Sequence, residues 1–117
     1  MGFVRRVHGG LVANEVSRVS SFAQRLFGLL GRSELAPNEG LWFDCCSAIH
    51  TLGMRVAIDV IFVDARYMVV QVNPDVRPGC WYLGCARSRG VIELGIGALA
   101  QAEVVVGDVL EFIPSAL

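Results

Sequence analysis

The chain has 117 residues, a formal net charge of −1, and 54% hydrophobic against 18% charged residues. Without a basic block or basic–aromatic alternation it lacks the surface that nucleic-acid binding requires, so we expect no nucleic-acid partner. No apolar run approaches the roughly 18 residues of a membrane helix, and the opening residues are too polar for a signal peptide. We therefore expect one soluble, cytoplasmic domain over residues 1–117, or a secreted one if a leader segment was removed.

The first predicted elements are a short strand at residues 11–16 and a helix over about 21–31. Ser21 and Gln24 have the spacing of a capping box, and Gly31 suits the position just after a helix. Apolar residues recur between them at helical spacing. They are Phe22, Leu26, Leu29 and Leu30.

The rest of the chain predicts strands separated by turns. Residues rich in β-branched and aromatic side chains favour a hairpin over 58–73, with its turn at 64–67. The proline- and glycine-rich stretch 74–84 indicates an irregular loop. The other predicted elements are strands at 40–43, 91–96 and 109–113 and a helical turn at 97–102.

These elements predict a β-rich α+β fold. Strands do not alternate with helices, which argues against a doubly wound parallel sheet. We expect a small curled sheet or barrel of five to seven short, mostly antiparallel strands, with one main helix across it. The high hydrophobic content means either that most strands are covered on both faces or that one apolar face is kept for a partner.

Four groups of residues, in this order along the chain, resemble the domain of unknown function 192 family. The most specific group runs from Ile49 to Asp64, with a His-Thr-x-x-Met-Arg motif followed by Ile-Asp and an apolar strand. The other matching groups are Arg25-x-x-Gly28-Leu29-x-Gly31-Arg32, Gly40-Leu41-Trp42-Phe43 and Val91-Ile92-Glu93-Leu94-x-x-Gly97. The resemblance covers residues 10–113.

The resemblance implies a fold and a set of recurrent residues, but no established reaction. One departure is Ala57, where the family usually has proline before the Ile-Asp pair. The family also includes secreted members that carry leader segments.

Asp59 is the most informative polar residue, because it directly precedes an apolar strand. A carboxylate buried there needs a cation or several N–H donors. The available cations are Arg25, Arg55 and protonated His50, and backbone N–H groups are the alternative. Either arrangement would serve the fold alone, or it would line a polar pocket.

The leading functional hypothesis is a non-catalytic binding or accessory module with a polar cleft around Asp59 and His50. Charged groups around an apolar floor suit a small polar ligand or a peptide end. Trp81, in the irregular loop, is a candidate for lining the cleft. The candidate ligand-binding residues are Arg25, His50, Thr51, Asp59, Trp81 and Glu93.

Two alternatives stay open. A Cys/His hydrolase or thiol redox protein would use Cys46, Cys80 or Cys85 with His50, and a docking module would bury an apolar surface on a partner protein. The cysteine spacing is a poor zinc signature, so we expect no metal site and no cofactor. Small buried side chains are the simplest interpretation of the cysteines. The sequence does not indicate an oligomeric state.

Overall fold

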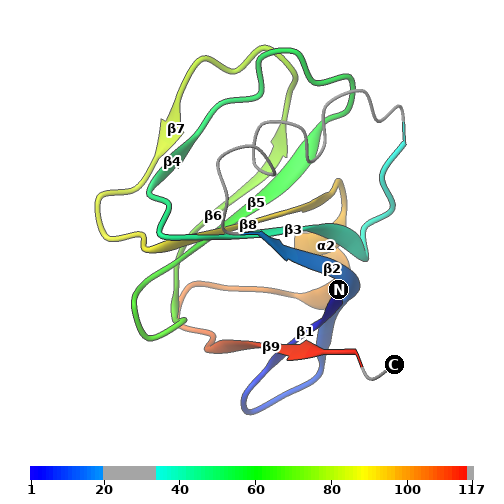
Figure 1. Cartoon of the computed structure of the whole chain (residues 1–117), viewed down its shortest axis with the longest axis vertical. Coiled ribbons are helices and arrows are strands. Elements are labelled where there is room, and N and C mark those ends of the chain that lie inside the picture. Colours follow the sequence, from blue (N-terminus) through cyan, green and yellow to red (C-terminus); the bar gives the residue numbers. More distant parts are fainter. Residues whose placement is uncertain (20–33, 116–117) are drawn as a thin grey trace.

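A curled seven-stranded sheet forms the body of the protein (Figure 1). The computed structural model describes residues 1–19 and 34–115. The strand order is β6-β5-β8-β3-β2-β1-β9, while β4 and β7 form a separate two-stranded ribbon. The strands are β1 (Gly2–Arg6), β2 (Leu11–Val19), β3 (Glu39–Asp44), β4 (Ala48–Ile49), β5 (Ile58–Val63), β6 (Val69–Val76), β7 (Leu83–Gly84), β8 (Gly90–Gly95) and β9 (Leu110–Pro114). All neighbouring strands are antiparallel except β2 and β3.

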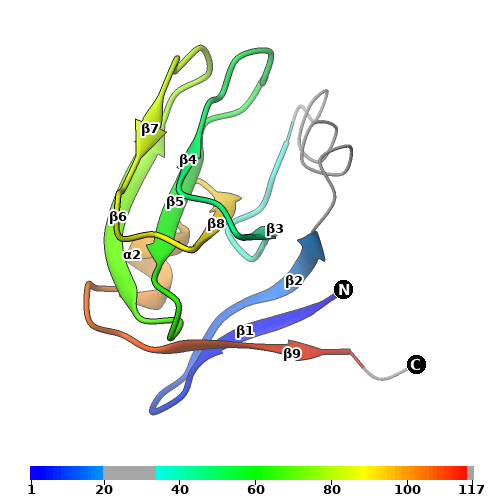
Figure 2. The same ribbon diagram turned by 60° about the vertical axis from the view of Figure 1, so that its left-hand side comes forward.

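The sheet curls until its two edge strands, β6 and β9, meet at one end, which is visible when Figures 1 and 2 are compared. Met68 and Val109 form a bridge there. The Val69 N–H donates to the Asp108 carbonyl at 2.7 Å, and the Leu110 N–H donates to the Tyr67 carbonyl at 2.9 Å. The result is a curled sheet rather than a closed barrel, which is one of the two forms that the sequence predicted.

The sheet has an apolar cluster on each face, because side chains alternate along its strands. The inner cluster, inside the curl, includes Trp42, Ile61, Ile92, Leu94 and Leu99. The outer cluster includes Leu41, Phe43, Val60, Phe62 and Val91, and parts of the β4–β7 ribbon pack against it.

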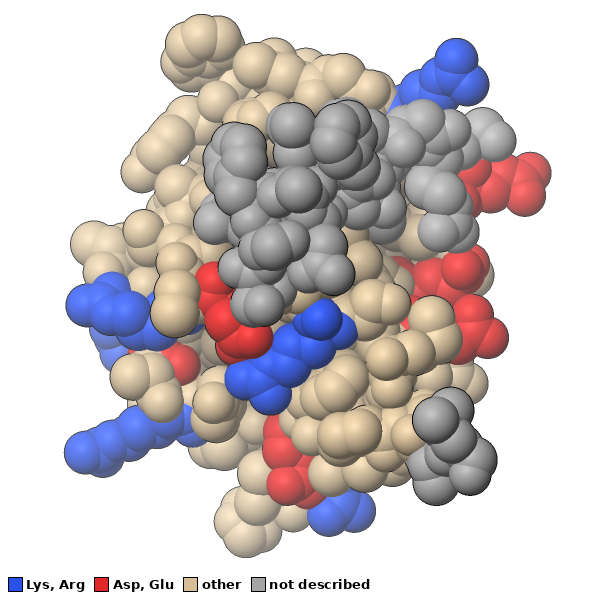
Figure 3. Space-filling model, in the orientation of Figure 1, with Lys and Arg blue, Asp and Glu red and all other residues tan. Residues whose placement is uncertain are grey.

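The central strands explain the high hydrophobic content. Every residue of β5 and of β8 is buried, so both faces of these strands are covered. For the middle of the sheet, the high hydrophobic content therefore reflects strands covered on both faces, which is the first of the two interpretations of the sequence. Figure 3 shows one face of the molecule, where charged side chains are scattered over a surface of other residues.

The predicted fold class is confirmed, and the differences in detail have local causes. The hairpin is present, but its return strand continues through Pro74 to Val76. Proline is tolerated there because β6 is an edge strand. Strand β1 was not predicted, since two arginines interrupt its apolar alternation, and the loop at 74–84 contains the two residues of β7. The predicted helix at 21–31 lies outside the described residues.

The described helix is α2 (Ala98–Ala102), and a carboxylate from a strand holds its first turn. The helix begins after Gly97, which has φ 96° and no side chain with which to cap the helix. Asp59 of β5, only 2% exposed, accepts hydrogen bonds from Gly97 N–H at 3.1 Å and Leu99 N–H at 2.9 Å. Its other oxygen accepts from Asp75 N–H at 2.9 Å. Asp59 therefore satisfies donors that the start of a helix leaves without partners.

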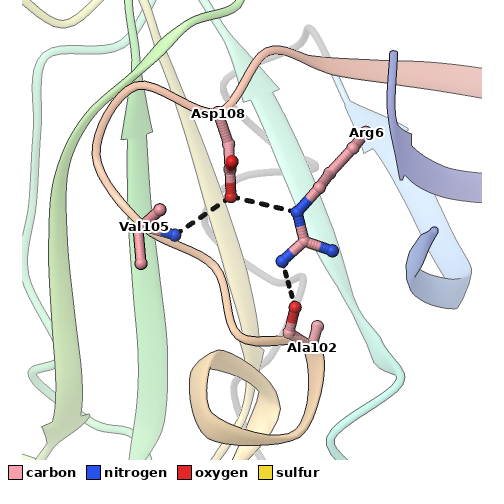
Figure 4. Close-up of polar contacts among 4 residues, drawn as sticks. All are labelled: Arg6, Ala102, Val105 and Asp108. Carbon is pink, nitrogen blue, oxygen red and sulfur yellow. Dashed lines mark hydrogen bonds and ion pairs between the residues drawn. The ribbon is translucent and has the colours of Figure 1, made fainter. Parts of the chain in front are cut away.

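A guanidinium holds the other end of α2 (Figure 4). Arg6 of β1 donates one hydrogen bond to the Ala102 carbonyl and another to Asp108, with its Nε 3.1 Å from the Asp108 carboxylate. The same carboxylate oxygen accepts from Val105 N–H at 3.0 Å. Arg6 thus ties β1 to the helix end and to the turn before β9.

No helix in the described part of the chain is long and apolar enough to cross a membrane.

Replacing Asp59 with alanine should lower the free energy of unfolding by about 3–5 kcal/mol. Three backbone N–H groups lose their acceptor, and a buried donor without a partner costs about 1–3 kcal/mol. The change is measurable as a shift in the urea midpoint. Asp59→Asn should lie between the wild type and the alanine variant, because one amide oxygen still accepts.

Asp75→Asn is the matched control. Asp75 has φ 52°, which asparagine tolerates, and its carboxylate makes an exposed ion pair with Arg77 at 3.0 Å. Such pairs contribute about 1 kcal/mol or less, so the midpoint should hardly move. An unchanged midpoint for Asp59→Ala would show that the carboxylate does not hold the helix.

Candidate functional site

Two loops meet at one end of the protein, above the sheet in Figures 1 and 2. The first, residues 50–57, connects β4 to β5, and the second, residues 77–82, connects β6 to β7. Thr51 joins them. Its backbone N–H donates to the Cys80 carbonyl at 2.9 Å, and its carbonyl accepts from Gly79 N–H at 3.1 Å.

The Thr51 side chain adds a second set of bonds. Its hydroxyl donates to the Arg77 carbonyl at 2.7 Å and accepts from Cys80 N–H at 2.8 Å. Gly53 and Gly79 both have φ above 80°, where glycine is favoured, and they turn the two loops on either side of Thr51. Thr51 is fully buried, so its hydroxyl serves the backbone and does not face solvent.

Large side chains project into solvent from these joined loops. Trp81 is 80% exposed and Tyr82 is 68% exposed, although the backbone beside them is fixed by Thr51. Leu52 is 39% exposed. His50 is also exposed, and its ring Nδ1 accepts from Leu52 N–H at 3.2 Å. We call His50, Leu52, Trp81 and Tyr82 the aromatic tip.

Among the predicted polar residues that the structure describes, Asp59 and Glu93 do not share a cleft. Asp59 lies opposite Leu94, and Glu93 lies opposite Val60, in the pairing of β5 with β8. Since side chains alternate between faces, Asp59 points to the inner face, whereas Glu93, 6% exposed, points to the outer face. Among the described residues no cation pairs with Asp59. Arg25 lies outside the described residues.

The described geometry does not bring the cysteines together with His50. None of the four is in a disulfide. Cys46 is buried in the outer cluster, and its thiol donates to the Ala48 carbonyl at 3.1 Å. Cys80 and Cys85 are half-buried against the same cluster. The described part of the chain holds no group of three or more His, Cys, Asp or Glu residues able to bind a metal ion. No hydrogen bond joins His50 to a cysteine there.

A cluster of Arg18 with one acidic and three aromatic side chains was not predicted from the sequence. Arg18 donates to Asp44 at 2.9 and 2.8 Å, and its guanidinium lies 5.2 Å from the centre of the Trp42 ring. It also lies 5.8 Å from the ring centres of Tyr67 and Phe112. The hydrogen bonds with Asp44 hold the pKa of Arg18 above its ordinary value. The cluster covers the end of the inner core, and only strand pairing brings its members together.

Comparisons with known proteins support the fold. One solved structure with a TM-score of 0.80 is a candidate transcription regulator from Sinorhizobium meliloti, 21% identical, with 96% of each chain covered. Another with a TM-score of 0.80 is a Novosphingobium aromaticivorans protein of unknown function, 22% identical, with 93% of this chain and 83% of that chain covered. At these identities the likeness shows the fold alone. No curated protein matches significantly.

Comparison with protein-family models tests the family membership that the sequence motifs predict. The model of the DUF192 family, described as uncharacterized ACR, matches residues 4–112. This range covers β2 to β8 completely and β1 and β9 in part. Because the match covers nearly the whole chain, the protein belongs to the DUF192 family.

Proposed function

We propose that the protein is a non-catalytic binding module that holds a peptide segment at the aromatic tip. The observation that carries the proposal is the 80% exposure of Trp81 on a loop whose backbone is fixed by buried hydrogen bonds. An exposed tryptophan on a fixed backbone offers a large contact area, and only two side-chain torsions have to be ordered on binding. Tyr82, the next residue along the chain, is 68% exposed.

A peptide suits this surface better than a small, highly charged ligand. Its apolar side chains can stack on Trp81 and Tyr82, while the exposed ring of His50 supplies a polar contact. The polar atoms of Asp59 and Thr51 are occupied by backbone groups, so they do not contact the peptide, and Thr51 acts only by fixing the two loops. The formal net charge of −1 gives no support for nucleic acid as the partner. A cytoplasmic location stays a prediction.

Titration with a degenerate hexapeptide library tests the proposal. The indole N–H resonance of Trp81 should shift progressively, whereas that of Trp42, 1% exposed, should not move and serves as an internal control. Trp81→Ala should weaken binding at least about tenfold, because buried aromatic anchors commonly contribute 2 kcal/mol or more at interfaces. Trp81 is exposed, so its removal should leave the urea midpoint unchanged.

Separate titrations with amino acids and with monosaccharides distinguish peptide recognition from small-ligand binding. A Trp81 shift with either of these, and none with hexapeptides, would contradict the choice of a peptide. Absence of any Trp81 shift, in a protein whose Trp42 resonance shows that it is folded, would overturn the proposal.

Thr51→Val tests whether the fixed backbone matters for the tip. Valine has nearly the same shape but leaves the Cys80 N–H and the Arg77 carbonyl without their side-chain partner. We expect a loss of about 2–3 kcal/mol in unfolding free energy, and faster hydrogen exchange at the Cys80 amide. Thr51→Ser keeps the hydroxyl and should exchange nearly as slowly as the wild type. Equal exchange rates in the valine and serine variants would contradict the assigned role.

A further inference from the structure

A shallow hollow lies apart from the aromatic tip, between the β5–β6 turn and the segment that precedes β8. Its volume is about 310 Å³, and its lining consists of Asp64, Ala65, Arg66, Arg87 and Arg89. In Figure 3, basic side chains lie on the left of the molecule, with other residues between them. We call this feature the basic hollow. None of its residues belongs to the aromatic tip.

The turn that forms one wall is held by its own hydrogen bonds. One carboxylate oxygen of Asp64 accepts from the N–H groups of Arg66 at 2.9 Å and Met68 at 3.0 Å. The Asp64 N–H donates to the Met68 carbonyl at 2.9 Å. Arg66 therefore extends from a backbone of defined shape.

The opposite wall is anchored to the sheet. The Arg89 N–H donates to the Val63 carbonyl at 2.8 Å. Ser88 is fully buried, and its hydroxyl lies 2.9 Å from the Cys46 carbonyl and 2.8 Å from the Gly90 carbonyl. The positions of Arg87 and Arg89 are thus fixed relative to the turn.

The hollow concentrates positive charge in a protein whose net charge is negative. Three arginines line it together with a single acidic residue, Asp64. One terminal nitrogen of Arg89 donates to the carbonyls of Ala86 at 3.3 Å and Ser88 at 2.8 Å, which orients the guanidinium and leaves its other N–H groups for a ligand. Within residues 1–19 and 34–115, the guanidinium groups of Arg66 and Arg87 have no hydrogen-bond or ion-pair partner.

We propose that the basic hollow binds the phosphate group of a small phosphorylated molecule. Guanidinium groups present planar, forked donors that match phosphate oxygens, and each hydrogen bond joins two charged groups. Three guanidiniums beside one carboxylate leave an excess of two positive charges, which suits a phosphate dianion better than a single carboxylate. Because the hollow is open, it can admit a phosphate group while the rest of the phosphorylated molecule stays outside.

The test is a titration with inorganic phosphate and with glycerol 3-phosphate, followed by the backbone and arginine Nε–H resonances. Sodium chloride at the same ionic strength, and glycerol, are the reference titrations. We expect saturable shifts at Arg66, Arg87 and Arg89 with both phosphates, with dissociation constants on the order of 1 mM. Neither reference titration should produce them.

Three variants sharpen the test. Arg87→Gln should weaken phosphate binding about tenfold, because it removes charge-assisted hydrogen bonds. Asp64→Asn keeps an oxygen that accepts from both turn N–H groups but removes the negative charge, so binding should strengthen about threefold. Arg55→Gln changes an exposed arginine outside the hollow and should leave binding unchanged. The replaced side chains of Arg87 and Arg55 are exposed, so the urea midpoints of these two variants should match the wild type.

Three results would overturn the proposal. Shifts that follow ionic strength, and appear equally with chloride, would mean only diffuse screening of surface charge. Equal weakening by Arg55→Gln and Arg87→Gln would mean that the hollow is not the site. Weaker binding by Asp64→Asn, in a variant whose turn resonances are unchanged, would contradict the charge argument.

Discussion

The packing of α2 and β6 against β5 depends on the hydrogen bonds that the Asp59 carboxylate accepts. The carboxylate lies on the inner face of β5, where every neighbouring residue of the strand is buried. Its oxygens take N–H donors from the start of α2 and from Asp75 in β6. A side chain that needs donors so deep in the protein fixes the position of whatever supplies them. One carboxylate thereby links the hairpin to the segment that follows β8.

The short helix α2 depends on charges supplied by distant strands. Five residues cannot form a stable helix alone, because nucleation costs more than one turn of hydrogen bonds returns. Gly97 provides the backbone turn but has no capping side chain, and Asp59 supplies the missing acceptor. Arg6 binds the carbonyl at the other end. A negative group at the first turn and a positive group at the last also agree with the helix dipole.

The sequence predicts those features that depend on neighbouring residues. β-branched and aromatic residues, together with turn chemistry, predicted the hairpin and the later strands, and the position of Asp59 before an apolar strand predicted its burial. The sequence left the partner of Asp59 open, because backbone N–H groups carry no residue-specific signal. It also grouped Asp59 with Glu93, whereas the pairing of β5 with β8 places them on opposite faces. Such parity is set by strand register, which no local motif reveals.

The buried polar groups limit where recognition can occur. Asp59 and Thr51 were predicted as ligand contacts, but their polar atoms are already bonded to backbone groups, and freeing them would leave buried donors without partners. Under the two proposals made above, a ligand instead contacts exposed side chains on fixed loops, such as Trp81 and Arg87. Both project from loops whose neighbouring residues, Thr51 and Ser88, are buried and bonded to backbone atoms. The polar residues inside the protein fix the loops, and we propose that the exposed residues on these loops bind.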